Sequence, residues 1–201
     1  MKKTEIKLII FDSYGVVLSR GYPGTCRVLA KRFKIPEEKL YEVIYKKYFN
    51  LAAERKITQK VAWQLPLQEL GLSISWQELR DLHLGLFKAN QGVVKIAKKL
   101  RKDYKTLMLS KNTRSQFAAT KKKFSKVWQS FSAVINTWEL NLPKASKKTI
   151  LTVAKRFKVK PAEILYADDQ KNNLIQAKKI GVKTIFYKNF KQFEKELNQY
   201  L

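Results

Sequence analysis

The stretch that most constrains this chain is a short apolar run, residues 8–11, which ends abruptly at Asp12. Continuous apolar runs of this length, bounded by turn residues, are typical of strands buried on both faces of a parallel sheet. An acidic residue at the end of such a strand lies at the edge where open α/β sheets bind their ligands. An Asp after a strand also commonly caps a turn or the next helix. This stretch alone leaves both interpretations open.

The rest of the chain shows two patterns of apolar residues. From about residue 22 to residue 89 they recur only at helical spacing, without a second strand-like run. After Gly92, helices alternate with strands expected at 105–109, 133–135, 164–167 and 183–187. This alternation predicts an α/β fold with a Rossmann-like parallel sheet covered on both faces. We therefore expect a core domain of residues 1–19 and 90–201, with an all-helical cap of residues 20–89 inserted after the first strand.

Capping residues predict where the inserted helices begin and end. Helices are expected over residues 23–33 and 36–51, each beginning at a proline, Pro23 or Pro36, as its first residue. Thr58 and Ser75 are expected to cap the next two helices, and Gly71 to end the first of that pair. Further helices are expected over residues 93–101, 114–124, 147–157, 172–180 and 190–200.

The strongest compositional feature is charge, because 42 Lys and Arg against 16 Asp and Glu give a formal net charge of +26. A field of this size attracts polyanions and makes their binding salt-dependent. The basic residues are mostly lysines in short, dispersed runs, so no single basic arm stands out. We expect a lysine-biased, solvated surface with non-specific nucleic-acid binding rather than specific recognition. The sequence is silent on oligomeric state.

Cysteine and apolar content limit the compartment. A single cysteine, Cys26, excludes an internal disulfide and suits a reducing environment. The apolar run before Asp12 is too short for a signal peptide or a membrane span, so we expect a cytoplasmic protein without a membrane partner. We interpret Cys26 and the one histidine, His83, as structural, since they are far apart in the chain.

Polar residues stand at the ends of three of the expected strands. These are Asp12, Ser110 and the pair Asp168 and Asp169, while Lys144 precedes a helix between the last two strands. Each has a plain structural alternative, since Ser and Asp cap helices after strands and lysine is common in this chain. Because the carboxyl ends of parallel strands meet at one edge of a sheet, the combination predicts a ligand site there.

In these motifs the chain resembles the haloacid dehalogenase-like (HAD) hydrolase superfamily over essentially its whole length. Four segments are similar to the four family motifs in order: FDSYGVVL, LMLSKNT, LPKASKKTI and ILYADDQKNNLIQAKKIGVKTIFY. The insertion point is that of members with a C1-type helical cap, and ERKITQKVAWQLPLQELGL is similar to their cap sequence. The resemblance implies the HAD-like fold and hydrolase chemistry.

The resemblance further implies a Mg²⁺-dependent phosphatase that acts on a small phosphorylated substrate. Asp12 would be the nucleophile and would form an aspartyl-phosphate. Mg²⁺ would be held by the Asp12 carboxylate, the Tyr14 backbone carbonyl and the Asp168–Asp169 pair, the hard oxygen ligands that this ion prefers.

The resemblance also assigns the phosphate site. Ser110, Lys111, Asn112 and Lys144 would bind the phosphoryl group, and Ser110 and Lys144 would complete the catalytic set with Asp12 and Tyr14. Asn173, four residues after the second acid of the pair, would support the metal site. The helical cap would close over the substrate and exclude water.

Tyr14 departs from the phosphatase pattern. Family phosphatases typically carry a second Asp at this position, which protonates the leaving group and then activates water. A phenol, with a pKa of about 10, can donate a proton but is a poor base near neutrality. We therefore expect slow or unusual turnover.

Two alternatives follow from this departure. The 2-haloacid dehalogenases of the superfamily have Asp-x-Tyr-Gly here and attack carbon without a metal, so Asp12 could act in dehalogenation. The adjacent acids Asp168 and Asp169 favour a metal site instead, because two neighbouring carboxylates without a cation repel each other. The other alternative is a catalytically weak protein that retains the fold to bind nucleic acid or a phosphorylated ligand.

Overall fold

A computed structural model describes residues 5–201, so the first four residues of the expected core domain lie outside the described residues. The described chain forms two compact units. The core unit contains the residues up to Leu18 together with Ala89–Lys111 and Phe124–Leu201. The helical unit contains Ser19–Lys88 and Asn112–Lys123.

The core unit is built on a five-stranded, all-parallel sheet in the order β3-β2-β1-β4-β5. The first strand lies in the middle and is buried along its length, because it has a neighbour on each side and helices on both faces. The predicted α/β fold with a helical insertion after the first strand is confirmed. The strands are β1 (Leu8–Asp12), β2 (Lys105–Ser110), β3 (Ala133–Asn136), β4 (Ile164–Asp168) and β5 (Lys183–Phe186).

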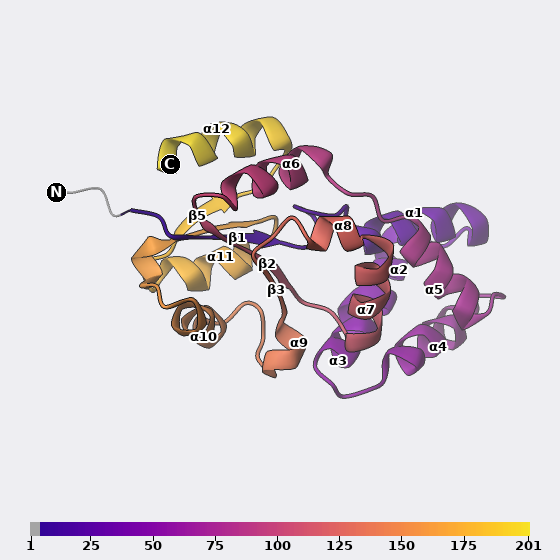
Figure 1. Cartoon of the computed structure of the whole chain (residues 1–201). Coiled ribbons are helices and arrows are strands. Elements are labelled where there is room, and N and C mark those ends of the chain that lie inside the picture. The colour runs from indigo at the N-terminus through magenta and orange to yellow at the C-terminus, as the bar shows by residue number, and fades with distance from the viewer. Residues whose placement is uncertain (1–4) are drawn as a thin grey trace. The chain divides into compact units, whose positions relative to one another are not determined.

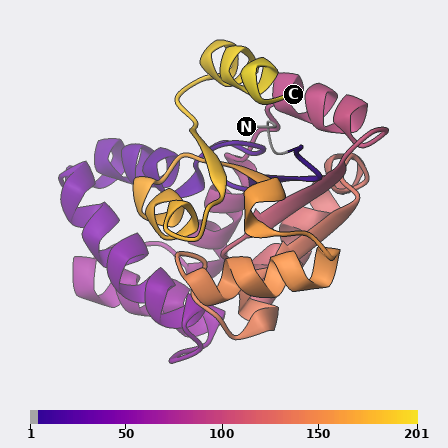
Figure 2. The same cartoon turned by 90° about the vertical axis from the view of Figure 1, so that its left-hand side faces the viewer.

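Two pairs of helices cover the two faces of the sheet (Figure 1 and Figure 2). Helices α6 (Gln91–Leu100) and α12 (Phe190–Tyr200) lie on one face, and α10 (Lys147–Phe157) and α11 (Lys171–Lys178) lie on the other. Alternate residues of a strand face opposite sides. Leu8 and Ile10 therefore pack in a cluster with residues of α10 and α11, whereas the Phe11 ring contacts the ring of Phe193 in α12.

Three short helical elements lie between the strands and longer helices of the core unit, and they were not expected from the sequence. They are α8 (Ser125–Trp128), α9 (Thr137–Leu140) and a 3₁₀ turn, Pro161–Glu163. Each is only three or four residues long, so it has too few positions to show a helical period.

The helical unit confirms the caps predicted at Thr58, Gly71 and Ser75. The starts predicted at Pro23 and Pro36 are each displaced, because the first helix begins at Gly21 and Pro36 is the N-cap of a helix that begins at Glu37. The Thr58 hydroxyl accepts from the Val61 N–H at 3.2 Å, and the Ser75 hydroxyl accepts from the Glu78 N–H at 3.1 Å. Gly71 ends its helix at φ +63°, the left-handed region that favours glycine. The helices of this unit are α1 (Gly21–Phe33), α2 (Glu37–Tyr41), a π-helical segment (Glu42–Phe49), α3 (Asn50–Ala53), α4 (Gln59–Leu70), α5 (Trp76–Gly85) and α7 (Arg114–Lys123).

A buried hydrogen-bond network centred on His83 joins α7 to the inserted helices. His83 Nε2 lies 2.9 Å from Gln116 Nε2, and His83 Nδ1 lies 2.9 Å from the Thr25 hydroxyl. The Tyr22 hydroxyl donates to Gln116 Oε1 at 3.3 Å. Because Gln116 belongs to α7, this network accounts for the grouping of Asn112–Lys123 with the helical unit, a grouping that the expected boundaries of 20–89 did not include.

His83 and Cys26 are both buried in the helical unit. Burial lowers the pKa of His83 to about 3, so the imidazole is neutral at physiological pH. Thr25 Oγ1 donates to a backbone carbonyl of its own helix and so accepts from His83 Nδ1–H, which leaves Nε2 to accept from Gln116. Burial also raises the pKa of the Cys26 thiol to about 12, far from a reactive thiolate.

The fold gathers lysines that are dispersed in the sequence. Neither α10 nor α11 contains an acidic residue, and exposed lysines occur along both, among them Lys147, Lys155, Lys171 and Lys178. Both helices lie on the same face of the sheet, so their charges add.

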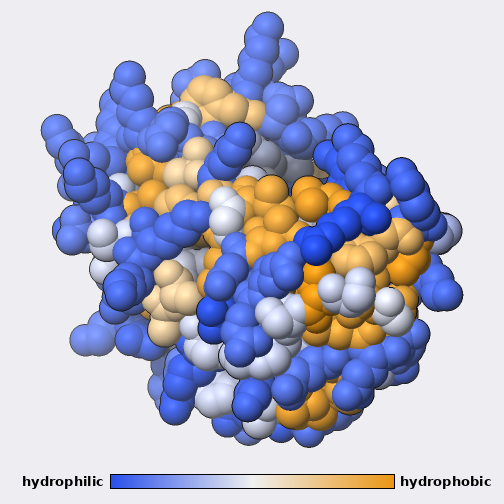
Figure 3. All heavy atoms as spheres, turned by 90° about the vertical axis from the view of Figure 1, so that its right-hand side faces the viewer, coloured by the Kyte–Doolittle hydropathy of each residue, from blue (hydrophilic) through white to orange (hydrophobic). Residues whose placement is uncertain are grey.

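On the face of the molecule drawn in Figure 3, hydrophilic side chains surround a smaller hydrophobic area. Among residues 5–201, no helix combines the length and the hydropathy that a membrane span requires.

Candidate active site

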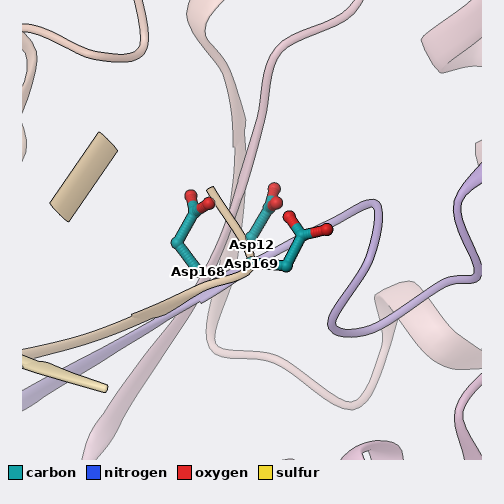
Figure 4. Close-up of side chains that lie close together, drawn as sticks. All are labelled: Asp12, Asp168 and Asp169. Carbon is teal, nitrogen blue, oxygen red and sulfur yellow. The ribbon is translucent and has the colours of Figure 1, made fainter. Parts of the chain in front are cut away.

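Three buried carboxylates meet at the carboxyl end of the sheet (Figure 4). Phe11 of β1 pairs with Ala167 of β4, so Asp12 and Asp168 follow at the same level on neighbouring strands. Asp169 comes directly after β4. One ligand oxygen from each of the three side chains lies within 4.8 Å of the others, as expected from the sequence.

Lys144 joins this cluster from the segment between α9 and α10. Its ammonium donates to Asp12 Oδ1 and, at 2.9 Å, to Asp168 Oδ2, and its side chain is only 5% exposed. Burial alone would lower the pKa of Lys144, but the charges of Asp12 and Asp168 outweigh it and the pKa is raised. The lysine is therefore a fixed positive charge beside the predicted nucleophile.

Asp12 is held in an environment that disfavours a lone negative charge. Burial raises its pKa well above the usual range, the charge of Asp168 raises it further, and Lys144 opposes both effects. Lys144 contacts both Asp12 and Asp168, so these two buried carboxylates share one ammonium. An additional cation would favour the ionised Asp12 that nucleophilic attack requires.

Asp168 accepts hydrogen bonds at both of its carboxylate oxygens. Its Oδ1 accepts from the Gln170 backbone N–H at 2.8 Å, and its Oδ2 accepts from the Tyr166 hydroxyl at 2.5 Å. The Asn173 amide donates to both oxygens, at 3.0 and 2.9 Å, and its predicted support of a metal site stays a prediction.

The turn after β1 brings Gly15 against Asp169. Gly15 has φ +108°, and a Cβ built there would lie 2.7 Å from Asp169 Oδ1 and closer still to Oδ2. The turn is closed by the Leu18 N–H, which donates to the Ser13 carbonyl at 2.7 Å. Tyr14 lies half-buried in this same turn. Its assignment as a proton donor and carbonyl ligand stays a prediction.

The predicted phosphate-binding residues are divided between the two units. Ser110 ends β2 one position beyond Leu109, which pairs with Asp12, and Lys111 follows it half-buried. Asn112 belongs to the helical unit, where its Oδ1 accepts from the Thr113 N–H at 2.9 Å. The core unit thus brings Ser110, Lys111 and Lys144 to the end of the sheet, but it does not include Asn112.

Two buried hydroxyls at this end of the sheet have no hydrogen-bond partner among the described residues. They belong to Ser110, the predicted phosphate ligand, and to Ser13, which sequence reasoning did not select. Buried hydroxyls without partners are uncommon, because the lost hydrogen bond to water is costly. Both are available to a polar ligand.

The donor set fits a hard divalent cation. All three acids offer carboxylate oxygens, the ligand type that Mg²⁺ prefers, and no sulfur or imidazole ligand joins them among residues 5–201.

Tyr166 was not selected from the sequence, although a signal for it existed. Residues i and i+2 of a strand share a face, so a tyrosine two positions before Asp168 is placed to reach its carboxylate. The backbone N–H of Gln170 has no such signal, since any residue there supplies the same donor.

Comparison with known proteins gives the family of the chain. The haloacid dehalogenase-like hydrolase family matches residues 6–181. Among proteins with curated descriptions, none matches the sequence significantly.

Solved structures with the same fold include both phosphate-bound and haloacid-bound proteins. A HAD family enzyme from Bacteroides thetaiotaomicron, in complex with magnesium and inorganic phosphate, superposes with a TM-score of 0.72 at 18% identity, covering 91% of this chain and 94% of the other. L-2-haloacid dehalogenase from Xanthobacter autotrophicus, with chloropropionic acid covalently bound, gives 0.68 at 18% identity over 96% and 83% of the chains.

A predicted HAD-like family hydrolase from Porphyromonas gingivalis gives a TM-score of 0.72 at 22% identity, covering 96% of this chain and 98% of the other. These identities establish a shared fold. With the match over residues 6–181, they show that the chain belongs to the haloacid dehalogenase-like hydrolases.

Proposed function

We propose that this chain is a Mg²⁺-dependent phosphoester hydrolase that acts through an aspartyl-phosphate on Asp12. The observation that carries the proposal is the buried cluster of three carboxylates at the carboxyl end of the sheet. Attack on carbon by a lone aspartate needs no such cluster, whereas a bound divalent cation requires oxygen ligands of this kind. The Bacteroides enzyme bound to magnesium and phosphate supports the proposal by analogy of fold.

The residues of the core unit have distinct parts in the proposed reaction. A carboxylate oxygen of Asp12 forms a bond to phosphorus, and the bond from phosphorus to the leaving oxygen breaks. Water then attacks phosphorus, which restores the Asp12 carboxylate and releases inorganic phosphate. Lys144 keeps Asp12 oriented and supplies positive charge, and the Ser110 hydroxyl donates to a phosphoryl oxygen.

The metal adds charge neutralisation at the phosphoryl oxygens when it is bound. Asp12, Asp168 and Asp169 are the carboxylates from which its ligands would come, with the Tyr14 carbonyl as the predicted fourth. Tyr14 is placed two residues after Asp12 and would give its phenolic proton to the leaving oxygen. Because a phenol is a weak base near neutrality, the hydrolysis of the intermediate is expected to be the slower half of the cycle.

The test is hydrolysis of p-nitrophenyl phosphate by the full-length chain, with and without Mg²⁺. We expect activity that is abolished by EDTA and restored by Mg²⁺, and that falls by at least about 10³-fold in Asp12→Asn, since the nucleophile is removed. Asp103→Asn is the matched control, because Asp103 is an exposed aspartate of the core unit outside the cluster. Activity that survives in Asp12→Asn, or that is indifferent to Mg²⁺, would contradict the proposal.

Dehalogenation is the second candidate function, and Tyr14 is the observation that favours it. In this reaction the Asp12 carboxylate attacks the carbon that bears the halogen, halide leaves, and water hydrolyses the resulting ester. The structure bound to chloropropionic acid shares the fold of this chain. Chloride release from 2-chloropropionate in the presence of EDTA, if it is lost in Asp12→Asn, would show that the chain is a dehalogenase and not a phosphatase.

A further inference from the structure

We infer that Ser13 is a second hydroxyl donor of the active site, and that it binds one oxygen of the substrate's phosphoryl group together with Ser110. This inference rests on the proposed function, because it names the group of the substrate that the two hydroxyls bind. Ser110 was expected at the phosphate site from the sequence, whereas no role was expected for Ser13.

The Ser13 side chain is a buried hydroxyl at the end of an apolar strand. It follows the buried strand β1 directly and is 0% exposed. Both of its backbone groups are hydrogen-bonded: the N–H donates to the Leu109 carbonyl at 3.2 Å, and the carbonyl accepts from the Leu18 N–H at 2.7 Å. The hydroxyl, by contrast, has no partner among residues 5–201. Because burying a hydroxyl without a hydrogen bond is costly, this position favours a partner that a ligand supplies.

Ser13 and Ser110 lie at matching positions of adjacent strands. Asp12 pairs with Leu109 in the register of β1 and β2, and each serine comes one position later. The bond from the Ser13 N–H to the Leu109 carbonyl continues this alignment past the end of β1. Side chains at matching positions share one face of a sheet. Ser110 is also 0% exposed, and its hydroxyl also lacks a partner in the part of the chain that the structure describes.

The spacing of the two hydroxyls suits one shared acceptor. Adjacent strands lie about 4.8 Å apart, so side chains at matching positions are separated by about that distance. An O–H···O hydrogen bond spans about 2.8 Å, so a single oxygen between the two serines can accept from both of them. The two hydroxyls do not bond to each other in the structure, which leaves both protons for such an oxygen.

A phosphoryl oxygen is the acceptor that fits this position. Ser13 directly follows Asp12, the predicted nucleophile, and Ser110 comes one position after the strand partner of Asp12. Since consecutive Cα atoms are only about 3.8 Å apart, a phosphoryl group on Asp12 has both serines as near neighbours. A negatively charged oxygen also accepts shorter and stronger hydrogen bonds than a neutral one, so it offsets the burial of two hydroxyls better than water does.

The experiment measures the binding of inorganic phosphate to the full chain by titration calorimetry in the presence of Mg²⁺. We expect Ser13→Ala to bind phosphate at least about tenfold more weakly, the usual effect of removing one hydrogen bond to a charged oxygen. Without phosphate, the urea midpoint of Ser13→Ala should equal or exceed that of the unsubstituted protein, because the hydroxyl then has no partner to lose. Circular dichroism checks that the variant folds.

Ser130→Ala is the matched control. Ser130 is also a buried serine of the core unit, at 6% exposed, but its hydroxyl donates to the Lys126 carbonyl at 3.1 Å. We expect this variant to have a lower urea midpoint and a phosphate affinity within about twofold of the unsubstituted value. A hydroxyl that binds a ligand and a hydroxyl that binds the protein thus give opposite results in the two measurements.

The double variant Ser13→Ala/Ser110→Ala tests whether the two hydroxyls share one oxygen. If they do, removing one hydroxyl changes how the other binds. The loss of phosphate affinity in the double variant should then differ by at least about threefold from the product of the two single losses. A loss equal to that product would assign the hydroxyls to separate oxygens and would overturn the shared site.

The outcomes separate this inference from the proposed function. If the unsubstituted protein neither hydrolyses p-nitrophenyl phosphate nor binds phosphate, the proposed function is overturned, and this inference with it. If hydrolysis depends on Mg²⁺ and Asp12 but Ser13→Ala binds phosphate as tightly as the unsubstituted protein, the inference alone is overturned. A lowered urea midpoint in that same variant would then assign the Ser13 hydroxyl to a structural water.

Discussion

Replacing Lys144 by methionine tests whether the buried ion pairs hold the site together. Lys144 is 5% exposed, and its partners Asp12 and Asp168 are 4% and 0% exposed at their side chains. At an effective dielectric constant of about 20, each contact of this length is an attraction on the order of 4–6 kcal/mol, most of which offsets the cost of removing the charges from water. Methionine has nearly the same length but leaves two buried carboxylates without their cation.

We expect Lys144→Met to lower the free energy of unfolding by about 3–5 kcal/mol, the usual effect of removing one partner of a buried pair. For a chain of this size the melting temperature should fall by on the order of 10 °C. Urea unfolding followed by circular dichroism, in EDTA at pH 7, measures the change. The control Lys147→Met removes an exposed lysine at the start of α10 and should change the stability by less than about 0.5 kcal/mol.

The double variant Lys144→Met/Asp168→Asn provides the sharper comparison. Once Asp168 is neutral, one of the two orphaned charges is gone, so the double variant should be more stable than the sum of the single effects predicts. A loss in Lys144→Met no larger than that in Lys147→Met would refute the reasoning. Strict additivity in the double variant would refute it too.

Three further perturbations follow from the structure. Gly15→Ala places a methyl group on the Asp169 carboxylate at φ +108°, and we expect calorimetry to show at least about tenfold weaker Mg²⁺ binding. His83 has a pKa of about 3 in the folded protein against 6.5 in the unfolded chain. As the pH falls, this histidine is therefore protonated in the unfolded chain before it is protonated in the folded protein. The neutral His83 thus contributes fully to the free energy of unfolding above pH 6.5, and this contribution is lost between pH 6.5 and pH 3. Urea unfolding should show a decrease of up to about 1.4 kcal/mol per pH unit. Replacing Lys155 and Lys171 by glutamate should weaken binding to a DNA duplex and lower the slope of log K against log salt by about 2.

Each of these has its own comparison. Gly71→Ala is the control for Gly15→Ala, because Gly71 also has a positive φ but faces open space, so equal Mg²⁺ affinity in the two variants would contradict the steric argument. His83→Gln should show a shallower loss of stability between pH 6.5 and 3 than the unsubstituted protein, and parallel curves would rule out His83 as the cause. Lys95 lies on α6, on the opposite face of the sheet. If Lys95→Glu weakened DNA binding equally, the net charge of the protein and not the position of the lysines would determine the binding.

Much of the fold could be predicted because its signals are local. The apolar run before Asp12 predicted a buried strand, and the side chains of Thr58 and Ser75 predicted where helices begin. These features depend on residues within one turn or one strand. The ends of three strands also predicted Asp12 and Asp168 as neighbours, because parallel strands align their carboxyl ends.

The tertiary structure alone decided which groups pair with which. Nothing near Gln116 in the sequence indicates a bond to His83, 33 residues away, yet this contact joins α7 to the inserted helices. The pairing of β1 with β4 likewise brings Asp12 beside Asp168, and Lys144, 132 residues from Asp12, contacts both. The sequence by itself determined the elements and the chemical groups at their ends. The partners of these groups, and with them the directions in which the pKa values of Asp12 and His83 shift, were decided by long-range packing, because burial and charge act through space and not along the chain.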